Sequence, residues 1–210
     1  MIYISRLLPD IKNTQARREL ANPYEMHRTL ARAFPEGNEW ADARLLFRVE
    51  QNGRIDDVAV LAQSRYLPDW SFLNNMNYLR KEVEIKRVEH INAPVGGRFC
   101  FRLRANPTLC RECKRHALRD ESDQIEWLKR KGLQHGFNVL RVRISLDGNE
   151  KLSRAGNSQG SLFGVRFDGV LRVDNSEAFA LAVETGIGSA KAFGFGLLSL
   201  GRAPSTTTAL

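Results

Sequence analysis

The chain has 210 residues, of which 42% are hydrophobic and 27% are charged, a composition that indicates a folded globular protein and excludes a disordered one. Its net charge of +8 favours a polyanionic partner, nucleic acid before an anionic membrane surface, over a merely soluble basic protein. No apolar run approaches the roughly 18 residues that span a bilayer, no signal peptide is expected, and an odd number of cysteines, 3, favours a reducing cytosol.

The first half of the chain alternates between strand-like and helix-like segments. Alternating apolar residues predict strands, and Asn52-Gly53 predicts the turn of a hairpin. The polar, basic segment 9–20 is predicted to be a loop. The predicted order is strand 1–8, helix 21–34, strands 44–50 and 57–64, short helix 68–79 and strand 81–91.

The same order of elements returns after residues 92–97, whose proline and two glycines predict a domain boundary. Ser122 and Ser176 are the expected caps of two helices. The predicted elements are strand 98–105, helix 122–136, strands 137–145 and 161–173, helix 176–186 and strand 195–201. We therefore predict an α+β protein of two tandem ferredoxin-like (RRM-like, βαββαβ) domains, residues 1–93 and 94–210. The aromatic signature of RNA-recognition domains is absent, so RNA binding would have to use other residues.

The helix predicted at 21–34, ANPYEMHRTLARAF, carries an unusual group of polar side chains. Asn22 suits the N-cap and Pro23 suits the first helical position. At 100° per residue, one apolar stripe is formed by Met26, Leu30, Ala33 and Phe34. His27 lies at the edge of that stripe, and further round the helix follow Tyr24, Arg28 and Arg32.

These side chains suit RNA cleavage in which the neighbouring 2′-hydroxyl is the nucleophile. That reaction needs a proton acceptor, a proton donor and positive charge beside the pentavalent transition state. Histidine transfers protons near neutral pH, tyrosine donates hydrogen bonds, and arginine stabilises phosphate charge. The alternative is that His27 is a structural residue at the core boundary and that Tyr24 and the arginines form a solvated face.

Three segments of the chain resemble the CasE endoribonucleases. They are ANPYEMHRTLARAF (21–34), FRLRANPT (101–108) and GIGSAKAFGFGLLSL (186–200). They occur in the order that the family has, and with the strand that leads into DGVLRV the resemblance extends over nearly the whole chain. The three together are specific to the family, whereas the glycine-rich segment alone recurs across repeat-associated RNA-binding proteins.

The resemblance implies metal-independent cleavage of CRISPR precursor RNA at the 3′ base of the repeat hairpin, leaving 5′-hydroxyl and 2′,3′-cyclic phosphate ends. It also implies that the enzyme stays bound to the mature RNA as a subunit of the Cascade complex in the prokaryotic cytoplasm, with no cofactor and no membrane partner. The family's catalytic tyrosine and histidine correspond to Tyr24 and His27, and its neighbouring arginine corresponds to Arg28. Arg32 stands where relatives often have lysine, which keeps the charge but changes its geometry.

Further basic and glycine residues are expected to bind RNA. The basic ones track phosphates along strand 98–105, which leads into a predicted basic loop, and along a hairpin of the second domain. They are Arg102, Arg104, Arg141, Arg143, Lys151 and Arg154. The glycine-rich segment lacks a nucleotide-loop pattern. It forms either a simple helix C-cap and turn or, as the resemblance favours, a backbone surface for an RNA strand, with Lys191 on a phosphate and glycines at Gly186, Gly188, Gly194 and Gly196.

Cysteine spacing raises a different possibility, a zinc site formed by Cys100, Cys110, Cys113 and His116. The second ligand pair of a strong zinc signature is missing, and Cys100 lies in an alternating strand, so no metal site is predicted. Two other functions remain open. One is a non-catalytic module that binds an RNA hairpin and would not need Tyr24 and His27 in this register. The other is a metal-dependent nuclease, which no cluster of carboxylates in the sequence supports.

Overall fold

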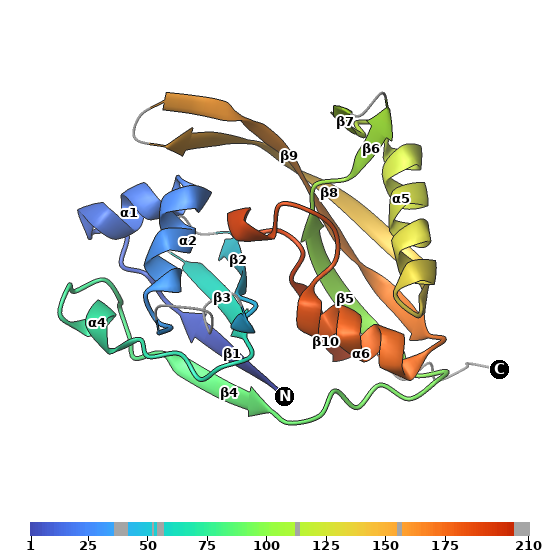
Figure 1. The fold of residues 1–210 in the computed structure, drawn as a ribbon, viewed down its shortest axis with the longest axis horizontal. Helices are drawn as coiled ribbons and strands as arrows, with labels where there is room; N and C mark the ends of the chain where they lie inside the picture. Colours follow the sequence, from blue (N-terminus) through green and yellow to red (C-terminus); the bar gives the residue numbers. More distant parts are fainter. Residues whose placement is uncertain (36–41, 52, 54–56, 112–113, 155–156, 204–210) are drawn as a thin grey trace.

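The computed structural model describes residues 1–35, 42–51, 53, 57–111, 114–154 and 157–203. Within that part of the chain, two four-stranded antiparallel sheets lie side by side with helices packed on them (Figure 1). Their strand orders are β2-β3-β1-β4 and β10-β5-β9-β8. In both sheets the first strand of the unit lies between its third and fourth, which is the ferredoxin-like order. The predicted fold class is therefore confirmed.

The first unit contains a helix that the sequence did not predict. Its elements are β1 (Ile2–Leu7), α1 (Thr14–Leu20), α2 (Pro23–Ala31), β2 (Leu46–Gln51), β3 (Val58–Ser64), α4 (Ser71–Asn74) and β4 (Glu84–Val88). Helix α1 lies where a loop was predicted, and Asn13 caps it by accepting a hydrogen bond from the Ala16 N–H at 3.0 Å. Asn52, in the predicted hairpin turn, lies outside the described residues.

A buried polar contact holds α1 against the rest of the first unit. The Tyr78 hydroxyl donates to a Glu19 carboxylate oxygen at 2.7 Å, and Glu19 is 2% exposed. Burial, followed by the Glu19 hydrogen bond, raises the pKa of Tyr78 above its usual value, so the phenol stays protonated and donates. Because the inward face of α1 carries a carboxylate as well as Ala16, its apolar period is weak.

The second unit follows the predicted order with two differences. Its elements are β5 (Arg98–Ala105), β6 (Thr108–Arg111), β7 (Lys114–Ala117), α5 (Glu121–Gln134), β8 (Phe137–Arg154), β9 (Asn157–Val173), α6 (Ser176–Thr185), the 3-10 turn η1 (Lys191–Phe193) and β10 (Leu198–Arg202). The hairpin β6–β7 replaces the predicted basic loop. The helix N-caps are Asp120 and Asn175 rather than Ser122 and Ser176, and Asn175 accepts from the Ala178 N–H at 3.0 Å.

Each unit has an apolar core between its sheet and its helices. In the first, Met26 and Leu30 of α2 pack in one cluster with Phe47 of β2. In the second, α5 and α6 cover the face of the sheet that carries Phe101 and Phe167. The predicted boundary at 93/94 lies in the segment between β4 and β5 and stays a prediction. In the described part of the chain, no helix is long and apolar enough to cross a membrane.

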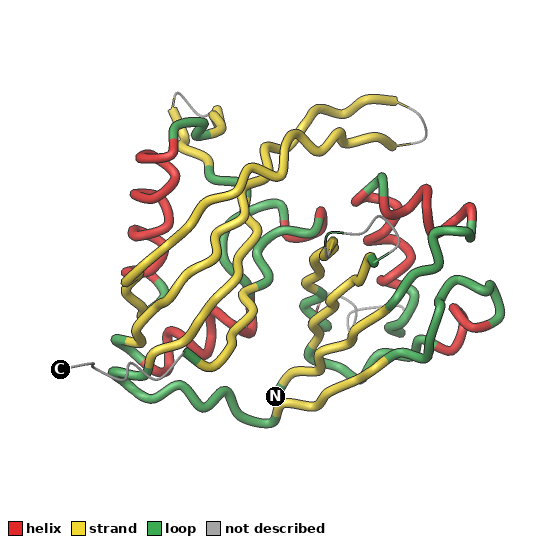
Figure 2. The backbone as a smooth tube through the Cα atoms, turned by 180° about the vertical axis from the view of Figure 1, so that it is seen from behind, coloured by secondary structure: helices red, strands yellow, loops and turns green. Residues whose placement is uncertain are grey.

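Strands β8 and β9 continue beyond the second sheet as a long hairpin. In two opposite views this hairpin projects towards the side of the first unit on which α1 and α2 lie (Figures 1 and 2). Its pairing shifts register between Val139 and Arg141 and again between Leu146 and Gly148, and such irregularities bend and twist a strand pair. The fold thus brings the hairpin of one unit near the helices of the other.

Candidate catalytic helix and nucleic-acid interface

Helix α2 begins as the sequence predicts. The Asn22 side chain accepts a hydrogen bond from the Tyr24 N–H at 3.2 Å, and Pro23 occupies the first helical turn. Met26 and Leu30 are each 1% exposed, so the apolar stripe faces the core as expected. With its start and one face fixed in this way, the helix holds the polar residues beside the stripe in a defined direction.

His27 lies half-buried at the edge of that stripe. Its ring is tilted by 39° against the Phe47 ring, with 6.2 Å between the centroids. Burial lowers the pKa of His27 below the usual value of 6.5, because the charged form loses hydration. The imidazole is therefore mainly neutral at pH 7, the form that can accept a proton.

The other predicted residues of α2 surround this imidazole on the helix. Tyr24 lies half-buried one turn before it. Arg28 is exposed and pairs with Glu25 at 3.0 Å, while the Arg32 guanidinium stacks 4.5 Å from the Phe72 ring centroid. His27, Arg28 and Arg32 line one surface depression of about 470 Å³, and Tyr24 lies outside that lining.

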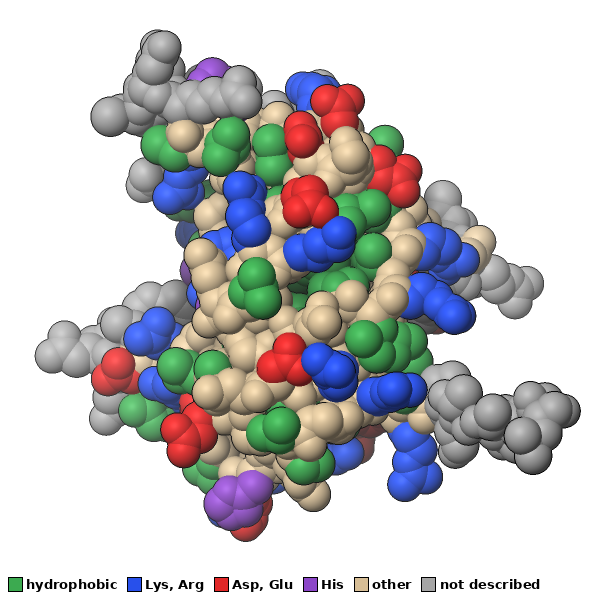
Figure 3. Space-filling view, turned by 90° about the vertical axis from the view of Figure 1, so that its right-hand side faces the viewer, with side chains coloured by type: hydrophobic (Ala, Val, Ile, Leu, Met, Phe, Trp, Pro, Cys, Tyr) green, Lys and Arg blue, Asp and Glu red, His purple; other side chains and the backbone are tan. Residues whose placement is uncertain are grey.

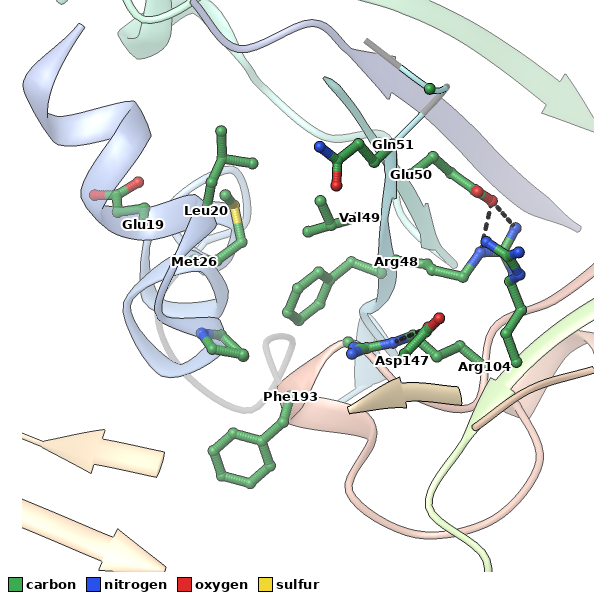
Figure 4. Close-up of a pocket in the computed structure, with 15 residues that line it drawn as sticks. Glu19, Leu20, Met26, Arg48, Val49, Glu50, Gln51, Arg104, Asp147 and Phe193 are labelled. Atoms are coloured by element: carbon green, nitrogen blue, oxygen red, sulfur yellow. Dashed lines mark hydrogen bonds and ion pairs between the residues drawn. The ribbon is translucent and has the colours of Figure 1, made fainter. Parts of the chain in front are cut away.

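A cleft of about 440 Å³ separates α2 from the second unit (Figure 4). Pro23 and Met26 of α2 line one side, and Phe193 and Gly194 of the glycine-rich segment line another. Arg104 and Asp147 also line it and are joined by an ion pair, drawn in Figure 4. The cleft thus joins the predicted catalytic helix to the predicted RNA-binding segment.

A buried arginine that the sequence analysis missed crosses the junction between the two units. The side chain of Arg48, in β2, is 2% exposed and pairs with Glu50 at 2.6 Å (Figure 4). It also donates to the backbone oxygens of Arg102 and Leu197, at 3.3 and 2.9 Å, and to the Ser199 hydroxyl at 2.8 Å. Arg48 therefore joins β2 to both β5 and β10. Alternation along β2 places Arg48 on the face opposite Phe47 and Val49, which pack in the core of the first unit. Nothing local marks that this face will be buried or which partners Arg48 will meet.

Arg102 and Arg104, which are predicted to bind RNA, form ion pairs with carboxylates. Arg102 pairs with Asp168 at 2.6 Å and with Glu50 at 2.9 Å, and the hydrogen bond that it donates to Asp168 is the main cause that raises its pKa. Arg104, 8% exposed, pairs with Asp147 at 2.9 Å. Both cations lie beside the junction with their charge paired, and their contact with RNA stays a prediction.

The predicted RNA-binding residues of the β8–β9 hairpin fall into two groups. Arg141 and Arg143 are exposed on β8, on the face of the second sheet opposite its helices. Lys151 and Arg154 belong to the paired backbone of the hairpin's far half, opposite Ser161 and Asn157, and their side chains lie outside the described residues.

Two glycines of the glycine-rich segment allow it to pack closely on the first unit. Gly186 and Gly194 have φ angles of +76° and +80°, and a Cβ would stand 2.8 Å from Leu46 and 3.2 Å from the Phe47 ring, respectively. Gly186 is also the C-cap of α6, as predicted by the alternative that this segment forms a simple helix C-cap and turn. The same segment contains the half-buried Gly188 and the buried Gly196.

Lys191 begins η1 and folds back onto the segment that carries it. Its ammonium donates to the Thr185 carbonyl at 2.7 Å. Burial lowers its pKa, and the charges of Arg44 and Lys131 lower it further. The cation is therefore held at the end of α6, among other positive charges.

The β6–β7 register separates two of the residues considered for zinc. Cys110 pairs with Arg115, and the neighbouring Leu109 pairs with His116. Because adjacent strand residues point to opposite faces, Cys110 and His116 cannot both reach one ion from this hairpin. Cys113 lies outside the described residues.

Comparison with known proteins gives one consistent family. A model of the family described as CRISPR associated protein matches residues 2–202. The CRISPR-associated endoribonuclease Cse3 of Thermus thermophilus is 35% identical over 212 residues, covering 95% of this chain and 99% of the relative. The CRISPR system Cascade subunit CasE of Escherichia coli is 33% identical, covering 84% and 90%. Among solved structures, a Cse3 endoribonuclease bound to a 19-nucleotide RNA matches with a TM-score of 0.85 and 34% identity, over 95% and 99% of the two chains.

Proposed function

This chain belongs to the CRISPR-associated protein family, and we propose that it is an endoribonuclease that cleaves CRISPR precursor RNA at the 3′ base of the repeat hairpin. The observation that carries the proposal is His27. It lies half-buried on a capped helix beside the exposed Arg28, in a chain whose relative over nearly its whole length is an endoribonuclease. A fold alone would not carry it, because ferredoxin-like domains serve many functions.

In the proposed reaction, the 2′-oxygen attacks the adjacent phosphorus and the bond to the 5′-oxygen breaks. The neutral His27 imidazole accepts the 2′-hydroxyl proton, Tyr24 orients that hydroxyl, and the leaving 5′-oxygen takes a proton from water. The guanidinium of Arg28, with Arg32 one turn away, stabilises the charge that develops on the phosphorane. The products are a 2′,3′-cyclic phosphate and a 5′-hydroxyl, and no step needs a metal ion.

We place the RNA stem against the cations that face solvent. Arg141 and Arg143 on β8 are exposed, and the hairpin that carries them projects towards α2; Lys151 and Arg154 continue the same hairpin. Phosphate contacts of this kind recognise the shape of an A-form stem more than its bases. Arg102 serves this surface indirectly, because its ion pair with Glu50 joins the two units. Arg104 is paired with Asp147 inside the second unit.

We further propose that the protein keeps its product and acts as a subunit of Cascade. The CasE relative from Escherichia coli, 33% identical, is a Cascade subunit. A stem gripped by many phosphate contacts dissociates slowly, which fits retention of the mature RNA.

The test is cleavage of a labelled repeat hairpin, taken from the genome that encodes this chain, in excess EDTA. The native protein should make a single cut that leaves a cyclic phosphate. His27→Ala should lose at least about 100-fold in rate, the lower end of a general acid–base contribution, while it still binds the RNA. The matched control is His90→Ala, a histidine that is exposed in the segment between the two units, and it should cleave as the native protein does.

Three results would contradict parts of the proposal. Normal cleavage by His27→Ala would remove the histidine from the reaction. Tight binding without cleavage by the native protein would favour the hairpin-binding module. Activity lost in EDTA and restored by a divalent cation would show a metal-dependent nuclease.

A further inference from the structure

A second groove lies on the far side of the glycine-rich segment from α2. It has a volume of about 450 Å³, large enough for a ligand of nucleotide size. Its walls are the β6–β7 hairpin, the second half of α5 and the glycine-rich segment, and we call it the α5 groove. Its lining is Asn106, Thr108, Cys110, Arg115, Trp127, Lys131, His135, Thr185, Gly186, Gly188, Ser189 and Lys191.

Positive charge gathers in the α5 groove, and none of the described residues that line it is a carboxylate. The pKa of His135 is lowered mainly by burial, and the nearby charges of Lys131 and Lys191 lower it further. The polar partners of the two ammonium groups are neutral: the Gln134 amide oxygen for Lys131, at 2.9 Å, and the Thr185 carbonyl for Lys191, at 2.7 Å. Cations that repel one another in a partly desolvated groove are stabilised by a bound anion.

The solvent-facing side of the same helix differs. There Lys129 pairs with Glu126 at 2.8 Å. Figure 3, which faces this edge of the molecule, shows acidic and basic side chains interspersed. That mixture is the ordinary surface of a soluble protein, so the charge in the α5 groove is a local feature of its lining.

The α5 groove connects with the cleft beside α2. A neighbouring groove of about 490 Å³ shares Asn106, Thr108, Arg115 and Ser189 with it and extends to Phe193. Phe193 in turn lines the cleft together with Pro23 and Met26 of α2. The connecting groove is also lined by Phe163 and Arg119, whose guanidinium lies 5.3 Å from the Phe163 ring centroid. Aromatic rings beside cations are the usual means of holding unpaired bases.

We propose that the α5 groove binds the sugar-phosphate backbone of a single-stranded RNA segment that flanks the repeat hairpin. Lys131, His135, Lys191 and Arg115 contact its phosphates. The connecting groove past Phe193 leads that segment away from the cleavage site. A single strand can bend around η1, whereas an A-form stem is a stiff double helix. This inference rests on the proposed function and adds to it a subsite for RNA outside the stem.

The test compares two RNAs that cannot be cut because the nucleotide before the scissile phosphate is 2′-deoxy. The first, called the blunt hairpin below, has no 5′ extension and ends one nucleotide after the scissile phosphate at the 3′ base of the stem. The second carries longer single-stranded extensions at both ends. The proteins are the native chain, Lys131→Gln and the matched control Lys129→Gln. Both lysines are on α5, and each makes one hydrogen bond or ion pair within that helix. The dissociation constant is measured at several salt concentrations.

The extensions should tighten binding by the native protein about tenfold and steepen the salt dependence by about 0.7 for each phosphate contact made by a single strand. Lys131→Gln should lose most of this gain and about 0.7 of the slope, and Lys129→Gln should keep both. All three proteins should bind the blunt hairpin equally.

The inference is overturned if the extensions add no affinity to the native protein, or if the two lysine variants respond alike, while the blunt hairpin is still bound and its cleavable form still cut. If the native protein neither binds nor cuts the blunt hairpin, the proposed function fails and the inference fails with it. Binding of inorganic phosphate at the groove, without any gain from the extensions, would show a small-anion site and overturn the RNA assignment.

Discussion

The arginines at the domain junction and those on the β8–β9 hairpin differ in what balances their charge. At the junction, Arg48 is buried among a carboxylate, two backbone carbonyls and a hydroxyl. Arg141 and Arg143 are exposed and form no ion pair with any residue that the structure describes. Arginine thus has two roles in this molecule. The paired arginine at the junction fixes the position of one unit against the other, and the unpaired arginines on the hairpin remain available to phosphate.

The difference depends on position in the sheets rather than on local sequence. Arg102 and Arg104 lie on the same face of the second sheet as Arg141 and Arg143. They are on the inner strand β5, where Asp168 and Asp147 from later strands reach them. The edge strand β8 leaves its arginines outside that network. Three substitution or titration experiments test this contrast, in order of decreasing effect.

Replacing Arg48 with methionine should cost most. It leaves Glu50 without its closest partner and removes the bonds to β5 and β10, and breaking a buried charge pair typically costs about 3–5 kcal/mol. Arg143→Met, on the exposed strand, should change the free energy of unfolding by no more than about 0.5 kcal/mol. Urea unfolding of both variants measures the difference. Equal losses would show that the junction arginine is no more structural than the surface one.

In RNA binding, the exposed arginines of the hairpin should matter although they contribute little to stability. The double variant Arg141→Ala/Arg143→Ala should lose about tenfold in affinity for the repeat hairpin, about 1.4 kcal/mol, and its salt dependence should become shallower as phosphate contacts are lost. Its unfolding free energy should not change. The control is Arg172→Ala, an arginine exposed on the neighbouring strand and paired with Asp174. Unchanged affinity in the double variant would place the stem elsewhere.

The third effect is smaller. It concerns His27, whose burial favours the neutral form of the side chain, whereas the buried Arg48 keeps its charge and is paired. Because burial lowers the pKa of His27, the unfolded chain binds a proton at pH values just below 6.5 that the folded protein does not bind. The unfolding free energy should therefore fall as the pH is lowered from about 6.5 to the folded pKa. Burial lowers the pKa of His135 as well, so His27→Ala should remove only part of this slope in urea unfolding at several pH values.

The same lowered pKa sets the expected shape of the cleavage profile. With neutral imidazole as the proton acceptor, the single-turnover rate should rise with pH and level off before 6.5. A rate that instead falls as pH rises through that region would make His27 the proton donor. An inflection well above 6.5 would contradict the effect of burial.

Local signals in the sequence were sufficient for most of the fold. The same order of alternating strands and capped helices occurs twice in the chain, and this repeat predicts two units of the same topology. Helix α1 was missed because its buried residues are an alanine and Glu19, which give no apolar period; Asn13, at its start, was the available signal. The β6–β7 hairpin was missed because its basic residues suggested a loop.

The candidate site was predictable where its residues share one helix and much less where they meet across the fold. Asn22, Tyr24, His27 and Arg28 lie within seven positions, so helical geometry alone sets their relation. The partners of Arg102 and Arg104 are 66 and 43 positions away. No local pattern shows that a basic strand will meet carboxylates from later strands. The sequence therefore indicates the charge of a segment but not whether that charge is already balanced.

The bonds of Arg48 also bear on how the chain folds as it is synthesised. Two of its partners, Leu197 and Ser199, come 149 and 151 positions later. While the ribosome has delivered only the first unit, β2 carries a cation that lacks most of its hydrogen-bond partners, and burying it then would be costly. Strand β10 and the residue just before it supply two of these partners. The first unit should therefore stay loosely packed until β10 has been synthesised, and the two units should then consolidate in one cooperative step.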